Sequence, residues 1–306
     1  MKKTISLLLP TRGRRKLAER FLQSVIAQSA HPELIEVVLC VDEDDPDSHG
    51  ISSSELALKE IVVPRQTMGA YNSICLRHAS GQITIAVNDD ILIRTNGWDD
   101  KVRALDARYP DGIYLGYGND LFKGEKVCTF PILSREACQV LAEPYPEIYK
   151  GAFIDIHLMD IFRRLERRGY PRMVYAEDIV FEHVHYRTNP AILDATYRER
   201  ARFGDDATFI ALSEARRYEA DRLLAHVSGR AVHDNPSVPR TNTTIKQSGF
   251  FGVVPVCFRT FLCDSDLPVT WRTYLFAYLI ARFYFSWFRN HLTHDALGRL
   301  LLACGL

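Results

Sequence analysis

Two adjacent carboxylates at the end of an apolar run carry the strongest chemical signal in this chain. Residues 83–87 read Ile-Thr-Ile-Ala-Val and lead directly into Asn88, Asp89 and Asp90. The apolar run predicts a strand that is covered on both faces, as in a parallel sheet. Carboxylates at the carboxyl end of such a strand lie where open α/β sheets bind ligands. Their oxygen atoms suit Mg²⁺ or Mn²⁺, although an ordinary strand-to-helix turn uses the same residue types.

Polar side chains also follow two other predicted strands and open one predicted helix. They are Thr11 and Arg14 after the strand 5–9, Asp42 after the strand 35–41, and Asn72 in the helix 69–79. Because the carboxyl ends of parallel strands meet at one edge of a sheet, we expect these groups to line it together. Such an edge fits a nucleotide, with carboxylates for the ribose or base and a metal for the diphosphate. The glycine-rich signatures of dinucleotide-binding and P-loop proteins are absent from the sequence.

Length and composition limit the classes of protein that this chain can represent. Its 306 residues are 47% hydrophobic and 25% charged, which predicts one large globular domain with a smaller appendage. Lys+Arg and Asp+Glu both number 38, so the basic excess typical of bulk nucleic-acid binding is missing. The seven cysteines include no CxxC pair, which favours reduced buried thiols in the cytosol. The first apolar run is too short for a signal peptide, and we expect a strand there.

The elements that must position the polar groups alternate between strand and helix. We expect strands at 5–9, 35–41, 61–63 and 83–87, helices at 17–28 and 69–79, and a helical turn at 55–59. This order predicts an α/β fold with a mostly parallel sheet flanked by helices. Further along we expect a hairpin of 112–117 with 127–133, a helix at 154–168, and extended segments at 173–175 and 179–181.

The last part of the chain is unusually aromatic. Nine aromatic residues lie between Trp271 and Phe288, and Arg282 is the only charged residue after Arg272 in that run. A helix that is apolar all round must be buried, but this one is shorter than the roughly 20 residues that span a bilayer. Two interpretations stay open: packing on the domain or on a second subunit, and in-plane membrane docking. Docking would place these basic groups near lipid head groups: Arg282, Arg289, His291 and Arg299.

Taken in order, these motifs resemble those of the family-2 glycosyltransferases with the GT-A fold. The family's opening pattern matches Ser6 to Arg14, and its strand that ends in carboxylates matches Glu36 to Glu43. Its glycine and asparagine helix, followed by a strand and an acidic triplet, matches Gly69 to Asp90. The resemblance covers about residues 4–190. It departs from the usual Asp-x-Asp at the first position, which is Asn88 here.

The resemblance implies a role for each matched residue. Asp42 would contact the nucleobase or ribose, with Thr11 and Arg14 lining the base pocket. Asn72, Asn88 and Asp89 would support the ribose or sugar of the donor, and Asp90 would bind Mn²⁺ or Mg²⁺. An acidic surface turn is the ordinary alternative for Asp42.

A histidine pair follows at His183 and His185. Side chains of an extended segment alternate, so both imidazoles should lie on one face. In GT-A enzymes a histidine at this point often completes the metal site, so the resemblance implies that one of the two is a ligand. Neutral imidazole suits Mn²⁺ as well as Zn²⁺. A zinc site and a pair of ordinary hydrogen-bonded histidines are the alternatives.

An inverting transfer needs a carboxylate that takes the proton of the acceptor hydroxyl. The resemblance places this base at Asp155, ahead of a helix that ends at Arg168-Gly169-Tyr170. Asp155 is also a plausible helix N-cap, and Asp160 is the second candidate for the base.

The sequence thus predicts a cytoplasmic, metal-dependent, inverting hexosyltransferase that uses a nucleotide-diphospho-sugar. The acceptor would be a glycan or lipid-linked molecule of surface polysaccharide synthesis, which suits a peripheral position on the inner face of a membrane. The alternatives are a non-catalytic scaffold with the same fold and a sugar-phosphate nucleotidylyltransferase. The predicted parts are a catalytic domain at 1–190, a helical extension at 191–231, a linker at 232–250, and an aromatic tail at 251–306 that mediates packing, oligomerisation or membrane docking.

Overall fold

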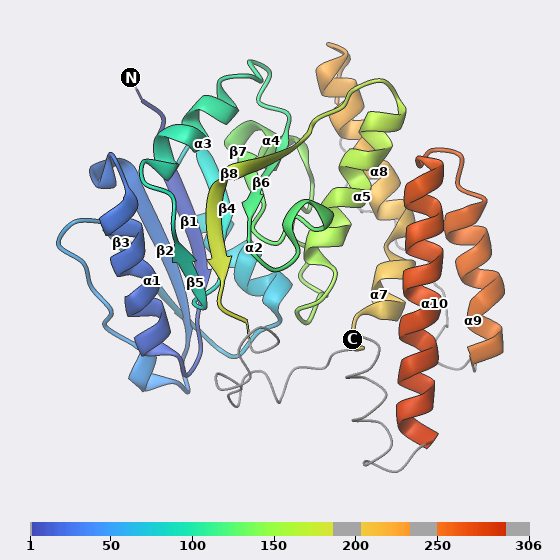
Figure 1. Ribbon diagram of the computed structural model, residues 1–306, viewed down its shortest axis with the longest axis horizontal. Helices are drawn as coiled ribbons and strands as arrows, with labels where there is room; N and C mark the ends of the chain where they lie inside the picture. The colour runs from blue at the N-terminus through green and yellow to red at the C-terminus, as the bar shows by residue number, and fades with distance from the viewer. Residues whose placement is uncertain (1, 186–202, 233–249, 292–306) are drawn as a thin grey trace.

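The computed structural model describes residues 2–185, 203–232 and 250–291. Its centre is an eight-stranded sheet with the strand order β3-β2-β1-β4-β7-β6-β8-β5. Helices lie against both faces of the sheet, and a group of helices from the second half of the chain packs at one end (Figure 1). The predicted α/β class, with a mostly parallel sheet flanked by helices, is confirmed.

The first half of the sheet is parallel. Its strands are β1 (Ile5–Pro10), β2 (Ile35–Asp42), β3 (Ala57–Val63) and β4 (Ile83–Ala86). Strand β1 is central, because its Ile5 pairs with Ile35 of β2 on one side and with Ile83 of β4 on the other. Every residue of β1 and β4 is buried, as expected for strands with helices on both faces. The helices between these strands are α1 (Arg15–Gln28) and α2 (Met68–His78).

The second half of the sheet is mixed. Strand β7 (Ile132–Ser134) runs antiparallel to β4 and to β6 (Leu115–Asn119), so the predicted hairpin is confirmed with shorter strands. Strand β8 (Met173–His183) runs parallel to β6 and antiparallel to the short β5 (Ile91–Ile93). The other elements along this part of the chain are α3 (Trp98–Asp106), α4 (Arg135–Val140) and the 3₁₀ turn Gly124–Lys126. The 3₁₀ turns Pro32–Leu34 and Pro46–Ser48 belong to the first half of the sheet, before and after β2.

Two predictions for the sheet were wrong or incomplete, and two elements beside it were not predicted. The helical turn expected at 55–59 is the start of edge strand β3, whose lysine and glutamate weaken the apolar signal of a strand. The segments 173–175 and 179–181 form one strand, β8, which crosses a register shift opposite Gly118 and Asn119. Strand β5 and helix α3 were not predicted, because the three residues of β5 are too few to show a period.

The helical part of the chain shares its core with the sheet. It comprises α5 (Ile154–Arg167), α7 (Asp206–Ala211), α8 (Ser213–Val227), α9 (Phe250–Cys257), a π-turn (Phe258–Leu262) and α10 (Val269–His291). One continuous apolar cluster contains Leu115 of β6, Phe162 of α5 and Leu275 of α10. The predicted boundary at 190 and most of the predicted linker lie outside the described residues, so the domain limits stay a prediction.

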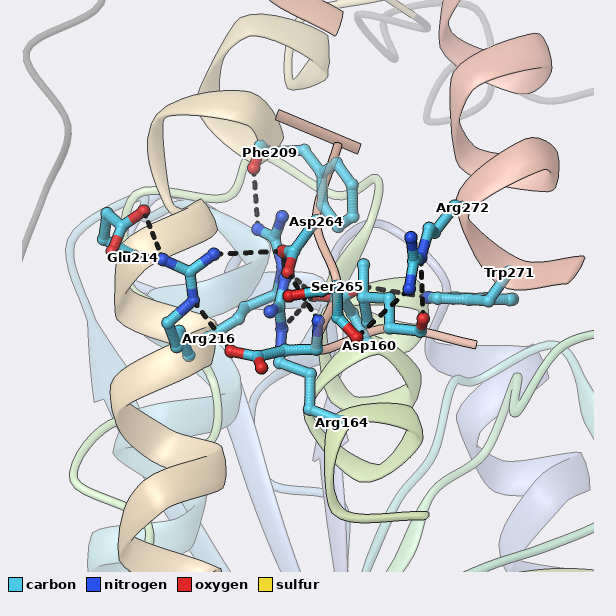
Figure 2. A network of polar contacts seen from close by, with 12 residues as sticks. Asp160, Arg164, Phe209, Glu214, Arg216, Asp264, Ser265, Trp271 and Arg272 are labelled. Atoms are coloured by element: carbon cyan, nitrogen blue, oxygen red, sulfur yellow. Dashed lines mark hydrogen bonds and ion pairs between the residues drawn. The ribbon is translucent and has the colours of Figure 1, made fainter. Parts of the chain in front are cut away.

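A buried polar network ties α5, α8 and α10 together (Figure 2). The carboxylate of Asp160 accepts hydrogen bonds from Nε of Arg164 at 3.1 Å, Nε of Arg216 at 2.7 Å and Nε1 of Trp271 at 2.9 Å. Burial alone would raise the pKa of Asp160, but Arg164 and Arg216 outweigh it and lower the pKa to about 2. Asp160 is therefore a saturated structural carboxylate, which excludes it as the second candidate for a base.

Helix α10 confirms the expected packing on the domain along one face and leaves aromatic groups on another. Leu275 and Leu279 are fully buried, whereas Tyr284 is 39% and Trp287 is 42% exposed. The expectation that Arg282 faces lipid head groups is wrong, because its Nε donates to the buried Asp206 carboxylate at 2.5 Å. The side chains of the other basic groups expected there lie outside the described residues: Arg289, His291 and Arg299. No helix in the described ranges is long and apolar enough to cross a bilayer.

The cysteines only partly follow the expectation of buried thiols. Cys40, Cys75, Cys128, Cys138 and Cys257 are free and buried, whereas Cys263 is free and exposed in the turn before α10. Cys304 lies outside the described residues.

Candidate functional site

The ends of β1 and β4 bring the first predicted site residues together. The hydroxyl of Thr11 donates to Oδ2 of Asp89 at 2.7 Å, and Nη1 of Arg14 donates to Oδ1 of Asp89 at 3.1 Å. The same Nη1 lies 3.6 Å from Oδ2 of Asp90. The two strands are parallel neighbours in register, so the residues that follow them meet at one edge of the sheet. The predicted cluster of hydroxyl, guanidinium and carboxylate groups therefore exists.

The buried carboxyl of Asp89 has a strongly shifted pKa. Burial is the largest cause and raises the pKa to about 6, and the like charge of Asp90 adds to it. Arg14 and Thr11 act in the opposite direction without cancelling the effect of burial. A positive charge bound beside these two carboxylates would stabilise their ionised form.

Strand β5 brings a histidine to the acidic pair. It begins at Ile91, directly after Asp90, and Ile91 pairs with His183 at the end of β8. The backbone N–H of Val184 donates to the carbonyl of Asp90 at 2.9 Å. As a result, Nε2 of His183 lies 3.4 Å from Oδ1 of Asp90, although the two residues are far apart in the sequence.

The two histidines of the predicted pair have different neighbours. Their ring centroids are 4.9 Å apart, and the ring of His185 stacks on Phe122 with centroids 4.9 Å apart and planes at 12°. The edge of His183 meets Phe130, with centroids 5.4 Å apart. Within the described residues, Nδ1 of His183 is buried and has no hydrogen-bond partner. Nε2 of His183 therefore faces an acidic site residue.

The donor atoms present fit a divalent cation of the kind that accompanies a diphosphate. No group of three or more His, Cys, Asp or Glu side chains in the described ranges could hold a metal by itself. A zinc site normally has at least three protein ligands, so this alternative loses support. Mg²⁺ and Mn²⁺ in nucleotide sites, by contrast, are often held by one or two protein groups together with substrate phosphates. Asp90 and His183 meet that lower requirement.

The end of β2 forms a second polar centre around Asp42. Its carboxylate is buried and accepts from Nη1 of Arg12 at 2.5 Å and from the hydroxyl of Tyr71. Arg12 also pairs with Asp44, and His49 bonds the backbone carbonyl of Asp42. Asp42 is therefore not a solvated turn residue, and Arg12 and Tyr71 are partners to which the sequence pattern assigned no role.

The two asparagines predicted to support the donor, Asn72 and Asn88, are neighbours in sequence of residues in these two polar centres. Asn72 is buried in the second turn of α2, one residue after Tyr71, and Asn88 is half-buried directly before the acidic pair. No side-chain contact decides the role of either amide, so both stay predictions.

The candidate base, Asp155, is the second residue of α5. It is half-buried, and the N-cap position belongs to Phe153, so Asp155 is not the cap of this helix. Phe153 has φ of +67°, a left-handed conformation that costs a non-glycine residue about 1–3 kcal/mol. Figure 1 shows that α5 begins at the edge of the sheet toward which β1, β4 and β8 run. Asp155 thus enters the structure on the side of the sheet that carries the site.

Asp120, which was not among the predicted site residues, holds a loop beside the histidine pair. Oδ1 of Asp120 accepts the backbone N–H groups of Phe122, Lys123 and Gly124 at 2.6–3.0 Å. The carbonyl of Asp120 accepts the N–H of His183 at 3.0 Å. Asp120 therefore holds the loop that carries Phe122 against the histidine pair. Asn119-Asp120 is ordinary turn chemistry, which was the available signal.

Comparisons with known proteins give a fold but no relative by sequence. No protein-family model and no curated protein matches the chain. Among solved structures, S. aureus TarS 1–349 has 12% identity and a TM-score of 0.50, over 95% of this chain and 93% of that chain. TarS 1–349 in complex with UDP has 13% identity, the same coverage and a TM-score of 0.48. The mannosyltransferase PcManGT from Pyrobaculum calidifontis, in complex with GDP-Man and Mn²⁺, has 17% identity and a TM-score of 0.47, over 92% of this chain and 86% of that chain.

At such identities a structural likeness shows the fold alone. The match to TarS 1–349 extends over nearly the whole of both chains, so it includes the helical part as well as the sheet. The chain therefore has the GT-A-type fold predicted from its motifs, with a helical C-terminal extension.

Proposed function

We propose that this protein is a metal-dependent, inverting glycosyltransferase of the hexosyltransferase type that uses a nucleotide-diphospho-sugar. One observation carries the proposal: Thr11, Arg14, Asp89, Asp90 and His183 converge at the carboxyl edge of a GT-A-type sheet. In open α/β sheets this edge is where ligands bind.

The donor would lie across the ends of β1, β2 and β4. Asp42, held by Arg12 and Tyr71, is suited to accept hydrogen bonds from the nucleobase or ribose. Thr11 and Arg14 would line the same pocket. Asn72, Asn88 and Asp89 would support the ribose or sugar with amide and carboxylate groups. Structures of TarS in complex with UDP-GlcNAc and with UDP, and of PcManGT in complex with GDP-Man, are known, and donors of this class suit the arrangement.

Asp90 and His183 would hold Mn²⁺ or Mg²⁺ next to the diphosphate. When bound, the cation supplies positive charge that stabilises the departing diphosphate. Arg14 contributes a second, permanent positive charge close to the acidic pair. This assignment favours His183 over His185, whose ring is stacked on Phe122.

Asp155 would remove the proton from the acceptor hydroxyl. The acceptor oxygen, as it loses this proton, attacks the sugar carbon from the face opposite the departing nucleoside diphosphate, so the new glycosidic bond forms with inversion. Asp160, one helical turn further along α5, is saturated by two arginines and a tryptophan and has no such capacity.

The acceptor would be a glycan or a lipid-linked molecule of surface polysaccharide synthesis, handled by a cytoplasmic protein at the inner face of the membrane. Support comes from helix α10, where Tyr284 and Trp287 remain exposed on a helix packed into the domain. Tyr and Trp are the residues that favour the membrane–water interface.

The deciding test is calorimetric binding of UDP, GDP, CDP and dTDP, each with and without Mn²⁺. We expect one nucleotide to bind in a Mn²⁺-dependent manner, and we expect Asp90→Ala to abolish this dependence. His183→Asn should weaken Mn²⁺-dependent binding about tenfold, whereas the matched control His185→Asn should change it less than twofold.

Turnover with a panel of donor sugars then separates an enzyme from a scaffold. Binding without turnover by any donor and acceptor would favour the non-catalytic scaffold. Formation of a nucleotide-sugar from a sugar phosphate and a nucleoside triphosphate would favour the nucleotidylyltransferase. No binding of any nucleotide would refute the proposed donor site itself.

A further inference from the structure

The loop before the candidate base is held by a residue of the helical extension. The backbone N–H groups of Lys150, Gly151 and Ala152 donate to the carboxylate of Asp205 at 3.0, 3.0 and 2.8 Å. Asp205 is 1% exposed, so this bond set is shielded from water. Three consecutive backbone donors on one buried carboxylate fix the path of the loop that leads into α5.

Asp205 gives up its usual local role to make these bonds. It occupies the N-cap position of α7, where an aspartate normally accepts a backbone N–H of its own helix. Here its side chain makes no such bond to α7. Both carboxylate oxygens point instead to a loop that is more than 50 residues earlier in the chain.

A second contact holds the residue between this loop and the candidate base. Phe153 is 3% exposed, and its ring stacks on Phe209 of α7 with centroids 4.7 Å apart. The guanidinium carbon of Arg282, on α10, lies 4.8 Å from the centroid of the Phe153 ring. Asp206, the neighbour of Asp205, pairs with Arg282 and so holds its guanidinium beside that ring.

These contacts surround the left-handed Phe153, two residues before Asp155. A buried aromatic residue keeps a positive φ only where its surroundings over-determine the backbone, and such residues cluster at functional sites. The carboxylate of Asp205 holds one side of the turn, and the Arg282–Asp206 pair holds the other. Together they set where α5 begins, and with it the position of the backbone of Asp155.

We propose that Asp205 and Arg282 are positioning residues for Asp155, so that helices α7 and α10 are a working part of the active site. The proposal rests on the proposed function, because it takes Asp155 as the base. It goes beyond that function by making the rate of transfer depend on residues that touch neither donor nor metal. A base displaced by about 1 Å typically costs about 100-fold in rate.

The helical extension offers a matched control. Glu219 of α8 is also 1% exposed, and its carboxylate accepts the backbone N–H groups of Ala142 and Glu143 at 2.9 and 3.0 Å. It therefore holds the start of the same connection between α4 and α5 by the same chemistry, ahead of the residues 150–152 that Asp205 holds. Glu219→Ala removes a comparable anchor but leaves the bonds of Asp205 to residues 150–152 in place.

The test compares wild type with Asp205→Ala, Asp205→Asn, Arg282→Met and Glu219→Ala in the full chain. Hydrogen–deuterium exchange reports the loops, and release of nucleoside diphosphate from UDP-GlcNAc or GDP-mannose, with water as acceptor, reports turnover. For Asp205→Ala we expect amide exchange at 150–156 to rise at least tenfold and kcat to fall about 10- to 100-fold. Binding of the nucleoside diphosphate with Mn²⁺ should stay within twofold of wild type, because the proposed donor site lies at the ends of β1, β2 and β4 and not at the loop that Asp205 holds.

Graded variants keep the test decisive if Asp205→Ala fails to fold. Asp205→Asn can keep the two bonds from Gly151 and Ala152 on its remaining oxygen and lose the one from Lys150. Its amide exchange at 150–156 and its kcat should therefore lie between those of wild type and Asp205→Ala. Arg282→Met should lower kcat by about tenfold with unchanged nucleotide binding. Glu219→Ala should raise exchange at 142–143 and leave kcat within twofold.

The outcomes separate this proposal from the proposed function. Unchanged exchange at 150–156 in Asp205→Ala, or faster exchange with an unchanged kcat, would overturn the positioning role. An equal fall of kcat in Glu219→Ala would also overturn it, because the effect would then be general loosening. A wild type that binds nucleotide but turns over no donor would refute the proposed function instead, while the exchange data would still show whether Asp205 holds the loop.

Discussion

Two buried carboxylates, Asp89 and Asp160, have opposite electrostatic environments. Asp89 is 4% exposed and its pKa is raised to about 6, whereas Asp160 is fully buried and its pKa is lowered to about 2. Burial opposes ionisation in both. The opposite charges of Arg164 and Arg216, which Figure 2 shows in the network around Asp160, outweigh the effect of burial on its pKa. Asp89, by contrast, shares Arg14 with the neighbouring Asp90.

The difference favours the edge that carries Asp89 and Asp90 as the ligand-binding region that we propose. The carboxylate of Asp160 finds all three of its hydrogen-bond donors within the folded chain, and these contacts join three helices. The edge that carries Asp89 and Asp90 would become electrostatically favourable when a cation binds. Perturbed pKa values of this kind are typical of functional sites, although structural networks produce them as well. The predictions below test this contrast.

Removing the carboxylate of Asp160 should have the largest effect on the free energy of unfolding. Asp160→Ala leaves Arg164 and Arg216 buried without their shared carboxylate, which typically costs about 3–5 kcal/mol. Urea unfolding followed by circular dichroism measures the loss. A loss below about 1 kcal/mol would show that the arginines find other partners and that the network is not the anchor of these helices.

Asp155, in the first turn of the same helix, should behave in the opposite way. Asp155→Asn keeps size and helix but removes the proton acceptor, so kcat should fall about 100- to 10,000-fold. The free energy of unfolding should change by less than about 0.5 kcal/mol, because Asp155 is half-buried and outside the network. Donor turnover and urea unfolding of the same sample give both quantities. A variant with normal turnover would move the base to another residue.

Glu219 sharpens the contrast because its pKa is raised without any role in the site. Burial is the main cause and raises the pKa to about 7, above that of an unfolded glutamate, despite two backbone N–H donors. Stability linked to this group is therefore present at acid pH and lost as the pH rises through about 7. Glu219→Gln removes this titrating group. Between pH 5 and 8 the free energy of unfolding should therefore fall less in the variant than in wild type, and the two falls should differ by at most about 3 kcal/mol. Urea unfolding at each pH gives the free energy of unfolding. If this free energy changed with pH equally in wild type and Glu219→Gln, the raised pKa would not belong to Glu219.

The smallest expected effect concerns the exposed face of α10. Tyr284→Ser with Trp287→Ser should weaken cosedimentation with anionic lipid vesicles severalfold and leave nucleotide binding unchanged, since both side chains are exposed. Phe258→Ser is a matched control, because it removes an exposed aromatic residue of the π-turn before α10. A wild type that never associates with vesicles would leave oligomerisation as the role of this face.

Most of the sheet could be predicted because its central strands are long apolar runs. Strands β1, β2 and β4 are covered on both faces, and such burial leaves a continuous signal in the sequence. Strand β3 was partly missed because an edge strand keeps charged residues on its open side. Strand β5 was missed because its pairing depends on β8, which is about 90 residues away.

The candidate site divides in the same way. Thr11, Arg14, Asp89 and Asp90 could be placed at one edge because each follows a strand of known direction. The choice between His183 and His185 could not, because alternation along a strand puts both on one face. The contacts of Asp205 and Arg282 with the loop before α5 could not be predicted either, because the spacing of residues in the sequence does not indicate them.

The sequence by itself determined the α/β class, the order of the central strands along the chain and the residues that follow them. These features depend on local periodicity and on chain direction, which a linear sequence contains. Only the tertiary structure decided that His183 faces Asp90, that Asp160 is saturated and that Arg282 turns inward. Each of these results depends on a contact between segments distant in the chain, and local residue types do not specify which partner such a contact selects.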